Sequence, residues 1–71
     1  MFATRIKELR KSRQLNQTEM GEKLNLSQKQ ISHLEIGRNE PDINTIKQYC
    51  TYFNISADYL IGLIDETKPL K

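Results

Sequence analysis

Apolar residues recur along this chain at spacings of three and four residues, the period of an α-helix, and never alternate with polar residues at period two. A helix over residues 3–13 places Phe2, Ile6, Leu9 and Arg13 near one stripe, and the other charged residues lie off it. A later helix, begun by Asp42, repeats its apolar residues at i, i+3, i+7 and i+10. The pattern therefore predicts an all-α fold. The stripe of that later helix consists of Ile43, Ile46, Cys50 and Phe53.

Capping sequences mark the starts of two short helices near the middle of the chain. Asn16 followed by Glu19, and Ser27 followed by Gln30, each form a capping box in which a side chain satisfies the other residue's backbone amide. Asn25, between the two helices, tolerates the left-handed backbone of a sharp turn. Two helices joined by a turn of about three residues outline a helix-turn-helix, although periodicity alone fits any small helical bundle almost as well. The five predicted helices are 3–13, 17–24, 28–36, 43–53 and 57–61, with Gly37 and Gly62 ending the third and fifth.

Length and cysteine content exclude several functions. A chain of 71 residues forms one domain with a thin core and has little room for a deep catalytic cleft. No apolar run approaches the ~20 residues of a membrane span, and the start lacks the apolar core of a signal peptide. One cysteine and one histidine cannot form an internal disulfide or a zinc cage. We expect a cytoplasmic protein without metal or cofactor, with a folded domain at 1–64 and a flexible tail at 65–71.

The net charge of +2 is unevenly distributed. Up to Arg38 the chain has eight basic and four acidic residues, and from Asn39 onward it has three basic and five acidic residues. A basic half on a small domain suggests a polyanionic partner, nucleic acid first of all. An ordinary solvated basic face explains the same charge equally well.

Three stretches together, Leu15–Arg38, Pro41–Ile46 and Phe53–Gly62, resemble the phage-repressor-type helix-turn-helix family, also called Cro/C1-type or XRE. The resemblance covers about residues 6–62. It implies a compact five-helix bundle of the lambda-repressor-like DNA-binding type, in which helices two and three form the helix-turn-helix. In such proteins the third helix, here 28–36, lies in the major groove of double-stranded DNA and the second crosses the backbone above it.

The resemblance implies that the third helix reads DNA bases with the face opposite Ile31 and Leu34. Glutamine can make two hydrogen bonds to adenine, lysine donates to guanine, and serine or histidine suits several base edges. For His33 a contact to the DNA backbone or to water is the alternative. The expected base contacts are Gln28, Lys29, Ser32 and His33.

The resemblance also implies contacts to phosphates and one internal ion pair. Gln17 lies in the first turn of the second helix, where backbone amides favour a phosphate, and in similar proteins such a glutamine bridges the DNA backbone and the start of the recognition helix, here Gln28. Arg10 and Glu35 match a pair that fastens the recognition helix to the first helix, and Arg10 is also a candidate phosphate ligand. Capping or loop roles are the alternative for the others. The expected phosphate contacts are Asn16, Gln17, Arg10, Arg38 and Asn39.

Five positions depart from the family pattern. Gly21 replaces the usual alanine, which permits close packing but lowers helix propensity by up to ~1 kcal/mol. Asn25 replaces a turn glycine, and Ile36 replaces a phosphate-binding asparagine found in some relatives. Glu40 and Asp42 lie where other relatives carry basic residues, so we expect that loop to make no minor-groove contact and no backbone contact beyond those of Arg38 and Asn39.

Nothing in the sequence indicates an enzyme, because it contains no paired carboxylates, no cysteine–histidine pair and no phosphate-cradling glycine loop. Cys50 is expected to be a small buried hydrophobic residue, with redox sensing as the alternative. Tyr49, Tyr52 and Tyr59 are expected to be half-buried and to have no functional role.

Apolar residues crowd the end of the fifth helix. A thin domain cannot bury all of them, and adjacent exposed apolar residues suggest a partner. Members of the resembled family dimerise here, and a twofold dimer would place two recognition helices ~34 Å apart on a near-palindromic operator. The alternative is that these residues fold back as a cap on the core. The expected interface residues are Leu60, Ile61, Leu63 and Ile64.

The sequence therefore predicts a sequence-specific DNA-binding transcriptional regulator of bacterial or phage origin, and repression by occlusion rather than activation. It is either a complete small regulator or the DNA-binding domain of a longer repressor. The alternative function is that of an antitoxin or another protein-interaction module that uses the C-terminal apolar surface.

Overall fold

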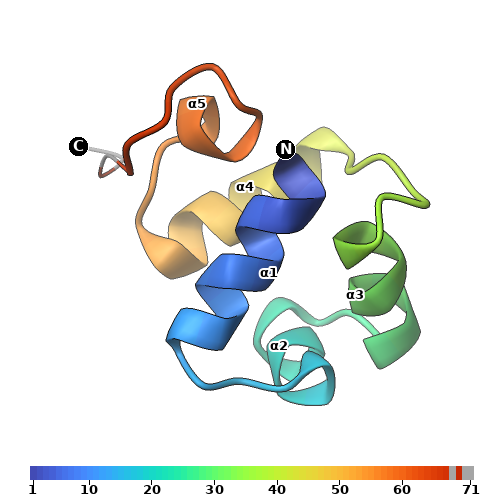
Figure 1. Cartoon of the computed structure of the whole chain (residues 1–71). Helices are drawn as coiled ribbons and strands as arrows, with labels where there is room; N and C mark the ends of the chain where they lie inside the picture. The colour runs from blue at the N-terminus through green and yellow to red at the C-terminus, as the bar shows by residue number, and fades with distance from the viewer. Residues whose placement is uncertain (68, 70–71) are drawn as a thin grey trace.

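Five helices make up the described part of the chain, which comprises residues 1–67 and 69 of a computed structural model (Figure 1). These residues contain no strand, so the all-α prediction is confirmed. Each predicted helix agrees with the observed one to within a residue at either end, because Arg13, Ile36 and Ile61 serve as C-caps rather than as helical residues. The helices are α1 (Phe2–Ser12), α2 (Gln17–Leu24), α3 (Gln28–Glu35), α4 (Ile43–Phe53) and α5 (Ala57–Leu60).

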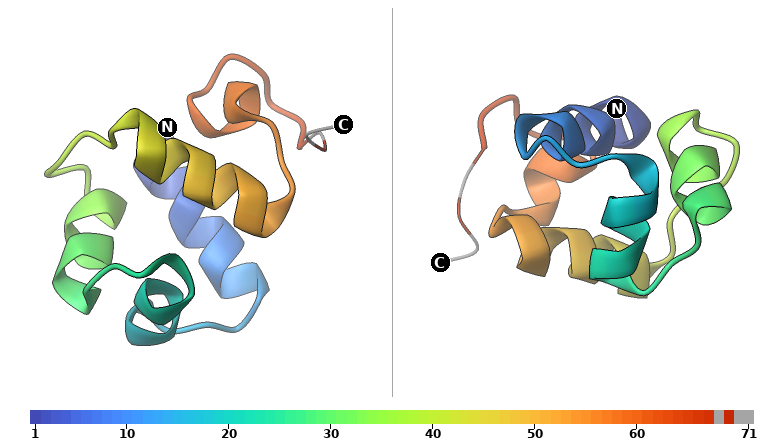
Figure 2. Two further views of the ribbon diagram at one scale, coloured as in Figure 1. Left: turned by 180° about the vertical axis from the view of Figure 1, so that it is seen from behind. Right: turned by 90° about the horizontal axis from the view of Figure 1, so that it is seen from below.

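The five helices divide the molecule into two ends. In the views of Figures 1 and 2, α2 and α3 lie at one end, α5 lies at the opposite end, and α1 and α4 run between them. The molecule measures 28 × 22 × 20 Å along its principal axes. No helix in the described part of the chain is long and apolar enough to cross a membrane.

Both predicted capping boxes form. The backbone amide of Glu19 donates to Asn16 Oδ1 at 2.7 Å, and the amide of Asn16 donates to Glu19 Oε1 at 2.9 Å. The corresponding distances for Ser27 and Gln30 are 3.1 and 2.8 Å. Asn25 ends α2 in the left-handed region with φ 58° and ψ 42°, as its type predicts. These local signals fix where α2 stops and α3 starts.

Gly21 allows the turn between α2 and α3 to pack directly on α2. The amide of Leu26 donates to the carbonyl oxygen of Gly21 at 2.8 Å. A Cβ atom on Gly21 would collide with the carbonyl oxygen of Leu26. The glycine that departs from the family's usual alanine is therefore required by the close approach of this turn.

One hydrophobic core joins all five helices, and Tyr49 is its largest fully buried side chain. The Tyr49 ring meets Phe2 edge-on, with centroids 5.7 Å apart, and stacks on Phe53 at 6.2 Å. Its hydroxyl has no hydrogen-bond partner among the described residues, and burial raises the pKa of this phenol. The buried apolar residues are Ile6, Met20, Leu24, Ile31, Leu34, Tyr49, Cys50, Phe53, Ile55 and Leu60.

The structure corrects two predictions about α4. Ile43 does not belong to the buried stripe, because it is the first residue of the helix, directly after the Asp42 cap, and its side chain is 71% exposed. Tyr49 is fully buried rather than half-buried, because it shares the inner face with Cys50. Cys50 is buried as expected, and that burial raises the pKa of its thiol. Tyr52 and Tyr59 are half-buried, as expected.

The end of α5 also differs from its prediction. Leu60 is fully buried in the core, so it has no surface to offer a partner and the folded-back alternative holds for this residue. Ile61 is 46% exposed and Leu63 is 71% exposed, while Ile64 is half-buried. The predicted flexible tail, 65–71, includes residues 68, 70 and 71, which lie outside the described residues.

Candidate nucleic-acid interface

The outer face of α3 carries the four side chains predicted to read DNA bases. Ile31, Leu34 and Glu35 turn inward and are buried. With ~100° between successive helical residues, the opposite side of this two-turn helix is left for polar groups. Gln28 and Lys29 are exposed there, and Ser32 and His33 are partly exposed. The structure thus brings these four side chains onto one accessible helix face, and their contact with DNA stays a prediction.

A network of side chains links α1, α2 and α3 behind this face. Arg10 holds the carboxylate of Glu35 with two hydrogen bonds, from Nε at 2.7 Å and from NH2 at 2.9 Å. Gln17 Nε2 donates to the same carboxylate at 3.2 Å. Gln28 Nε2 then donates to Gln17 Oε1 at 2.6 Å. Gln28, the first residue of α3, is therefore held by a chain of hydrogen bonds that begins at the buried Arg10–Glu35 pair and passes through Gln17.

The Arg10–Glu35 pair is the structural fastening that the family resemblance implied. Both residues are buried, and the side chain of Glu35 is only 1% exposed. The hydrogen bonds to Glu35, together with its charge, raise the pKa of Arg10 despite its burial. NH1 of Arg10 donates to the carbonyl of Leu15 at 2.7 Å. The guanidinium of Arg10 faces the protein, and its contact with a phosphate stays a prediction.

The remaining phosphate candidates lie at both ends of α3. Asn16 and Gln17 begin α2, and the Gln17–Gln28 hydrogen bond brings that helix start next to the start of α3. Arg38 and Asn39 follow the C-terminal end of α3 and are exposed. Gly37 makes the chain turn there with φ +76°, a backbone conformation that glycine adopts without strain. These four residues therefore bracket the base-facing side chains along the helix.

The basic surface is smaller than the charge count suggested. Arg5 and Arg10 are each only 8% exposed and point into the fold. Arg5 instead contacts the segment after α5, a role that counting charges cannot reveal. Its one sequence signal is its place beside Ile6, a residue of the inner stripe of α1. The exposed basic residues of the first half of the chain are Lys7, Lys11, Arg13, Lys23, Lys29 and Arg38.

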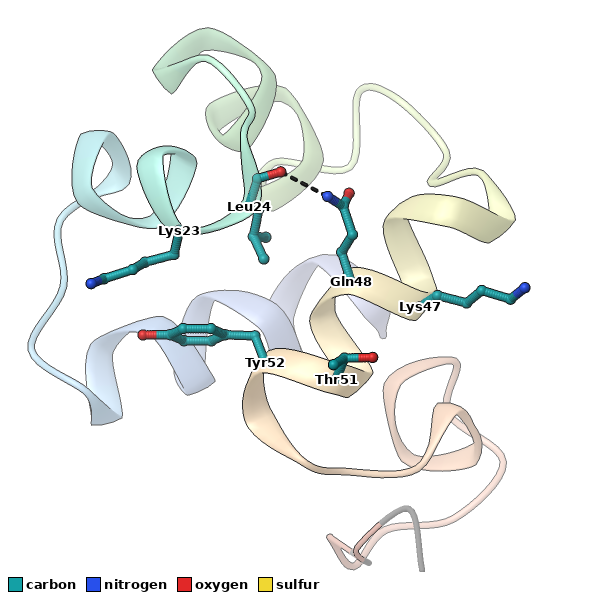
Figure 3. A pocket seen from close by; sticks show the side chains of 6 residues that line it. All are labelled: Lys23, Leu24, Lys47, Gln48, Thr51 and Tyr52. Carbon is teal, nitrogen blue, oxygen red and sulfur yellow. Dashed lines mark hydrogen bonds between the residues drawn. The ribbon is translucent and has the colours of Figure 1, made fainter.

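A shallow groove of about 360 Å³ lies on another part of the surface, between α2 and α4 (Figure 3). Gln48 crosses it and donates to the carbonyl of Leu24 at 2.8 Å. The ammonium groups of Lys23 and Lys47 point away from each other on either side of it. The described residues contain no cluster of three or more potential metal ligands. The face of α3 is therefore the better candidate site.

Comparison with known proteins agrees with this geometry. A family model described as "Helix-turn-helix domain" matches residues 3–66. The HTH-type transcriptional regulator ImmR of Bacillus subtilis (strain 168) is 34% identical over 64 residues, which are 90% of this chain and 50% of that protein. The immunity repressor protein of Bacillus phage phi105 is 33% identical over 58 residues, 82% of this chain and 40% of that protein.

A solved structure has the same fold. The crystal structure of a transcriptional regulator from Listeria innocua superimposes with a TM-score of 0.83 at 30% sequence identity, covering 93% of this chain and 62% of that chain. The chain spans about half the length of the curated relatives it matches.

Proposed function

Because the chain belongs to the helix-turn-helix domain family, we propose that it is a sequence-specific double-stranded DNA-binding regulator of transcription that represses by occupying its operator. Membership of this family, whose members regulate transcription without catalysis, agrees with the expectation that the chain is not an enzyme. The name of one relative, the immunity repressor protein of Bacillus phage phi105, supports repression over activation.

The single observation that carries the proposal is the orientation of Gln28 by Gln17, Glu35 and Arg10. A side chain held in place before binding loses less conformational entropy when it meets a base. Glutamine is the residue type that recognises adenine by two hydrogen bonds in the major groove. We assign Gln28 the most specific base contact, beside Lys29, Ser32 and His33.

Phosphate contacts would set the register of α3 on the duplex. Asn16 and Gln17 sit at the positive N-terminal end of α2, and Arg38 and Asn39 lie beyond the other end of α3. A phosphate at each end would align the helix with the groove between them. Asn16 serves this role with its amide nitrogen, because its Oδ1 already accepts the bond from Glu19.

The proposed assembly is a homodimer on a near-palindromic operator. Ile61 and Leu63 expose large apolar side chains next to each other, and Ile64 is half-buried beside them. The longest dimension of one protomer is 28 Å, so two copies side by side are compatible with recognition helices about one DNA turn, ~34 Å, apart. The interface is assigned to Ile61, Leu63 and Ile64, without Leu60.

Selection of bound sequences from random double-stranded DNA at moderate salt tests this function. The wild type should enrich one motif with twofold symmetry. Gln28→Ala should lose the preference at one position of each half-site, at a cost of about 1–3 kcal/mol in binding free energy.

Gln48→Ala is the matched control, because it removes a hydrogen-bonded glutamine from the α2–α4 groove and should select the wild-type motif. If no motif is enriched while the C-terminal apolar surface captures a protein partner, the interaction-module alternative is correct instead.

A further inference from the structure

Arg5 is a buried cation of α1 that the face of α3 does not use. Its side chain lies at the opposite end of the helix from Arg10 and is 8% exposed. NH1 donates to the carbonyl oxygens of Tyr59 and Ile64, each at 2.5 Å, and NH2 donates to Asp65 Oδ1 at 3.1 Å. The guanidinium carbon lies 4.4 Å from the centre of the Tyr59 ring. One side chain of α1 thus holds both the last turn of α5 and the segment that follows it.

The C-terminal end of the fold depends on such a contact. α5 has four residues, and a helix that short does not persist without tertiary support. A guanidinium is suited to the task, because the two N–H groups of NH1 satisfy two carbonyl oxygens at once and its charge complements the negative end of a helix. Asp65 adds little to the contact, because its side chain is 93% exposed and water screens the ion pair.

The backbone held by Arg5 is the one that exposes the apolar residues. Leu60 is anchored in the core, Ile61 and Leu63 project into solvent, and the amide of Leu63 donates to the carbonyl of Asp58 at 2.8 Å. Without the bonds to Tyr59 and Ile64, this short segment would sample many conformations, each with a different apolar surface.

We infer that Arg5 is a positioning residue for self-association: it fixes the segment Ile61–Ile64 in the conformation that a second copy of this chain binds. The inference rests on the homodimer proposed above. An interface fixed before binding avoids the entropy cost of ordering it during association, which otherwise weakens the dimer. Arg5 itself does not contact the second copy, and it affects association only through the backbone conformation of Ile61–Ile64.

Arg5→Met tests the inference, because methionine retains the apolar stem and loses the guanidinium. The dimer dissociation constant, measured by sedimentation equilibrium, should rise about tenfold or more, since several backbone residues must then be ordered on association. Affinity for a DNA half-site, which binds one protomer, should stay at the wild-type value, while affinity for the full operator falls. Amide hydrogen exchange should accelerate at Gly62–Ile64 and stay unchanged in α3.

Arg13→Met is the matched control. Arg13, the C-cap of α1, also lies over aromatic rings, 5.4 Å from the centre of Tyr52 and 5.1 Å from that of Phe53, but it is exposed. Its replacement should leave the dimer constant unchanged, and so should Asp65→Asn. If Arg5→Met does not fold, Arg5→Lys replaces it. Lysine keeps the charge but lacks the planar guanidinium, so the dimer dissociation constant should again rise.

Two results would overturn the inference. In the first, an Arg5 variant dimerises with the wild-type constant, and then the homodimer stands without a role for Arg5. In the second, half-site affinity and α3 exchange change as much as dimerisation does, which shows a role in general stability alone. A wild type that stays monomeric at high micromolar concentration, with and without operator DNA, would instead remove the homodimer itself and this inference with it.

Discussion

The two ends of the molecule are held together by different means. At the α2–α3 end, two capping boxes, a buried ion pair and two glutamines link three helices, so each exposed side chain of α3 starts from a fixed backbone. At the α5 end, a four-residue helix is anchored by the buried Leu60, and its last turn and the segment after it are held by one arginine from α1. The difference shows that the surface proposed to read bases is supported by side-chain bonds among three helices, whereas the surface proposed to meet a second copy has one side chain of α1, Arg5, holding its backbone.

Breaking the ion pair at the α2–α3 end should have the largest effect. Glu35→Ala leaves the buried guanidinium of Arg10 without its partner, which costs about 3–5 kcal/mol of unfolding free energy. Urea denaturation followed by circular dichroism measures the loss. Glu22→Ala, at an exposed position of α2, is the control and should change stability by less than about 0.5 kcal/mol. A loss below about 1 kcal/mol for Glu35→Ala would show that the pair is not a fastening.

Two neighbouring leucines separate folding from association at the α5 end. Leu60→Ala removes a fully buried side chain and should cost about 2–5 kcal/mol of unfolding free energy. Leu63→Ala, at a side chain that is 71% exposed, should leave the unfolding of the monomer nearly unchanged and weaken the dimer. Thermal unfolding at low concentration and sedimentation equilibrium distinguish the two effects. Equal destabilisation by both variants would mean that Leu63 belongs to the core.

Two glycines offer a similar comparison of the ends with a smaller effect. Gly21→Ala gains up to ~1 kcal/mol of helix propensity but forces a Cβ into the carbonyl oxygen of Leu26, so a net loss of about 1–3 kcal/mol is expected. Gly62→Ala meets only the flexible side chain of Met1 and pays about 1–2 kcal/mol for a left-handed backbone with φ +91°. Denaturant titration of both variants tests which one loses more unfolding free energy. If Gly21→Ala were more stable than the wild type, the carbonyl of Leu26 would have moved away from the new Cβ at little cost.

Tyr49 gives the smallest expected effect and a pH dependence. Burial raises the folded-state pKa of its phenol, so the stabilising contribution of the neutral form is complete below the unfolded-state pKa of about 10 and is lost as pH rises above it. Tyr49→Phe should abolish that loss and raise stability at pH 7 by about 1 kcal/mol, because the hydroxyl has no partner among the described residues. Tyr52→Phe, which removes the hydroxyl of a half-buried ring, is the control variant. An unchanged alkaline profile in Tyr49→Phe would contradict the assignment.

The sequence was sufficient for the helices and for much of the α2–α3 end, because the signals there are local. Capping boxes act over three residues, and Asn25 needs only its own backbone preference, so the observed helix ends follow from neighbouring residue types. The pairing of Gln17 with Gln28, and of Arg10 with Glu35, came from the family resemblance, and the structure confirms both.

The sequence was insufficient where burial depends on tertiary packing. A four-residue helix is too short for periodicity to show that Leu60 points inward while Ile61 and Leu63 point outward. The regular stripe of α4 included Ile43 because a period does not show where the core ends. Charge counting treated Arg5 as surface, since its one local signal, its place beside Ile6, does not show which carbonyl groups it meets.

Titration of isotope-labelled protein with its selected operator, followed by NMR, tests the central claim most directly, because each residue reports its own contact. The account predicts that the largest amide and side-chain shift changes fall on Gln28–His33 of α3, with smaller ones at Asn16, Gln17 and the Arg38–Asn39 loop. Residues of the α2–α4 groove, Lys47 and Gln48, should shift little. Changes centred on that groove or on the Ile61–Leu63 segment, with α3 unperturbed, would contradict the assignment of α3 as the surface that reads DNA.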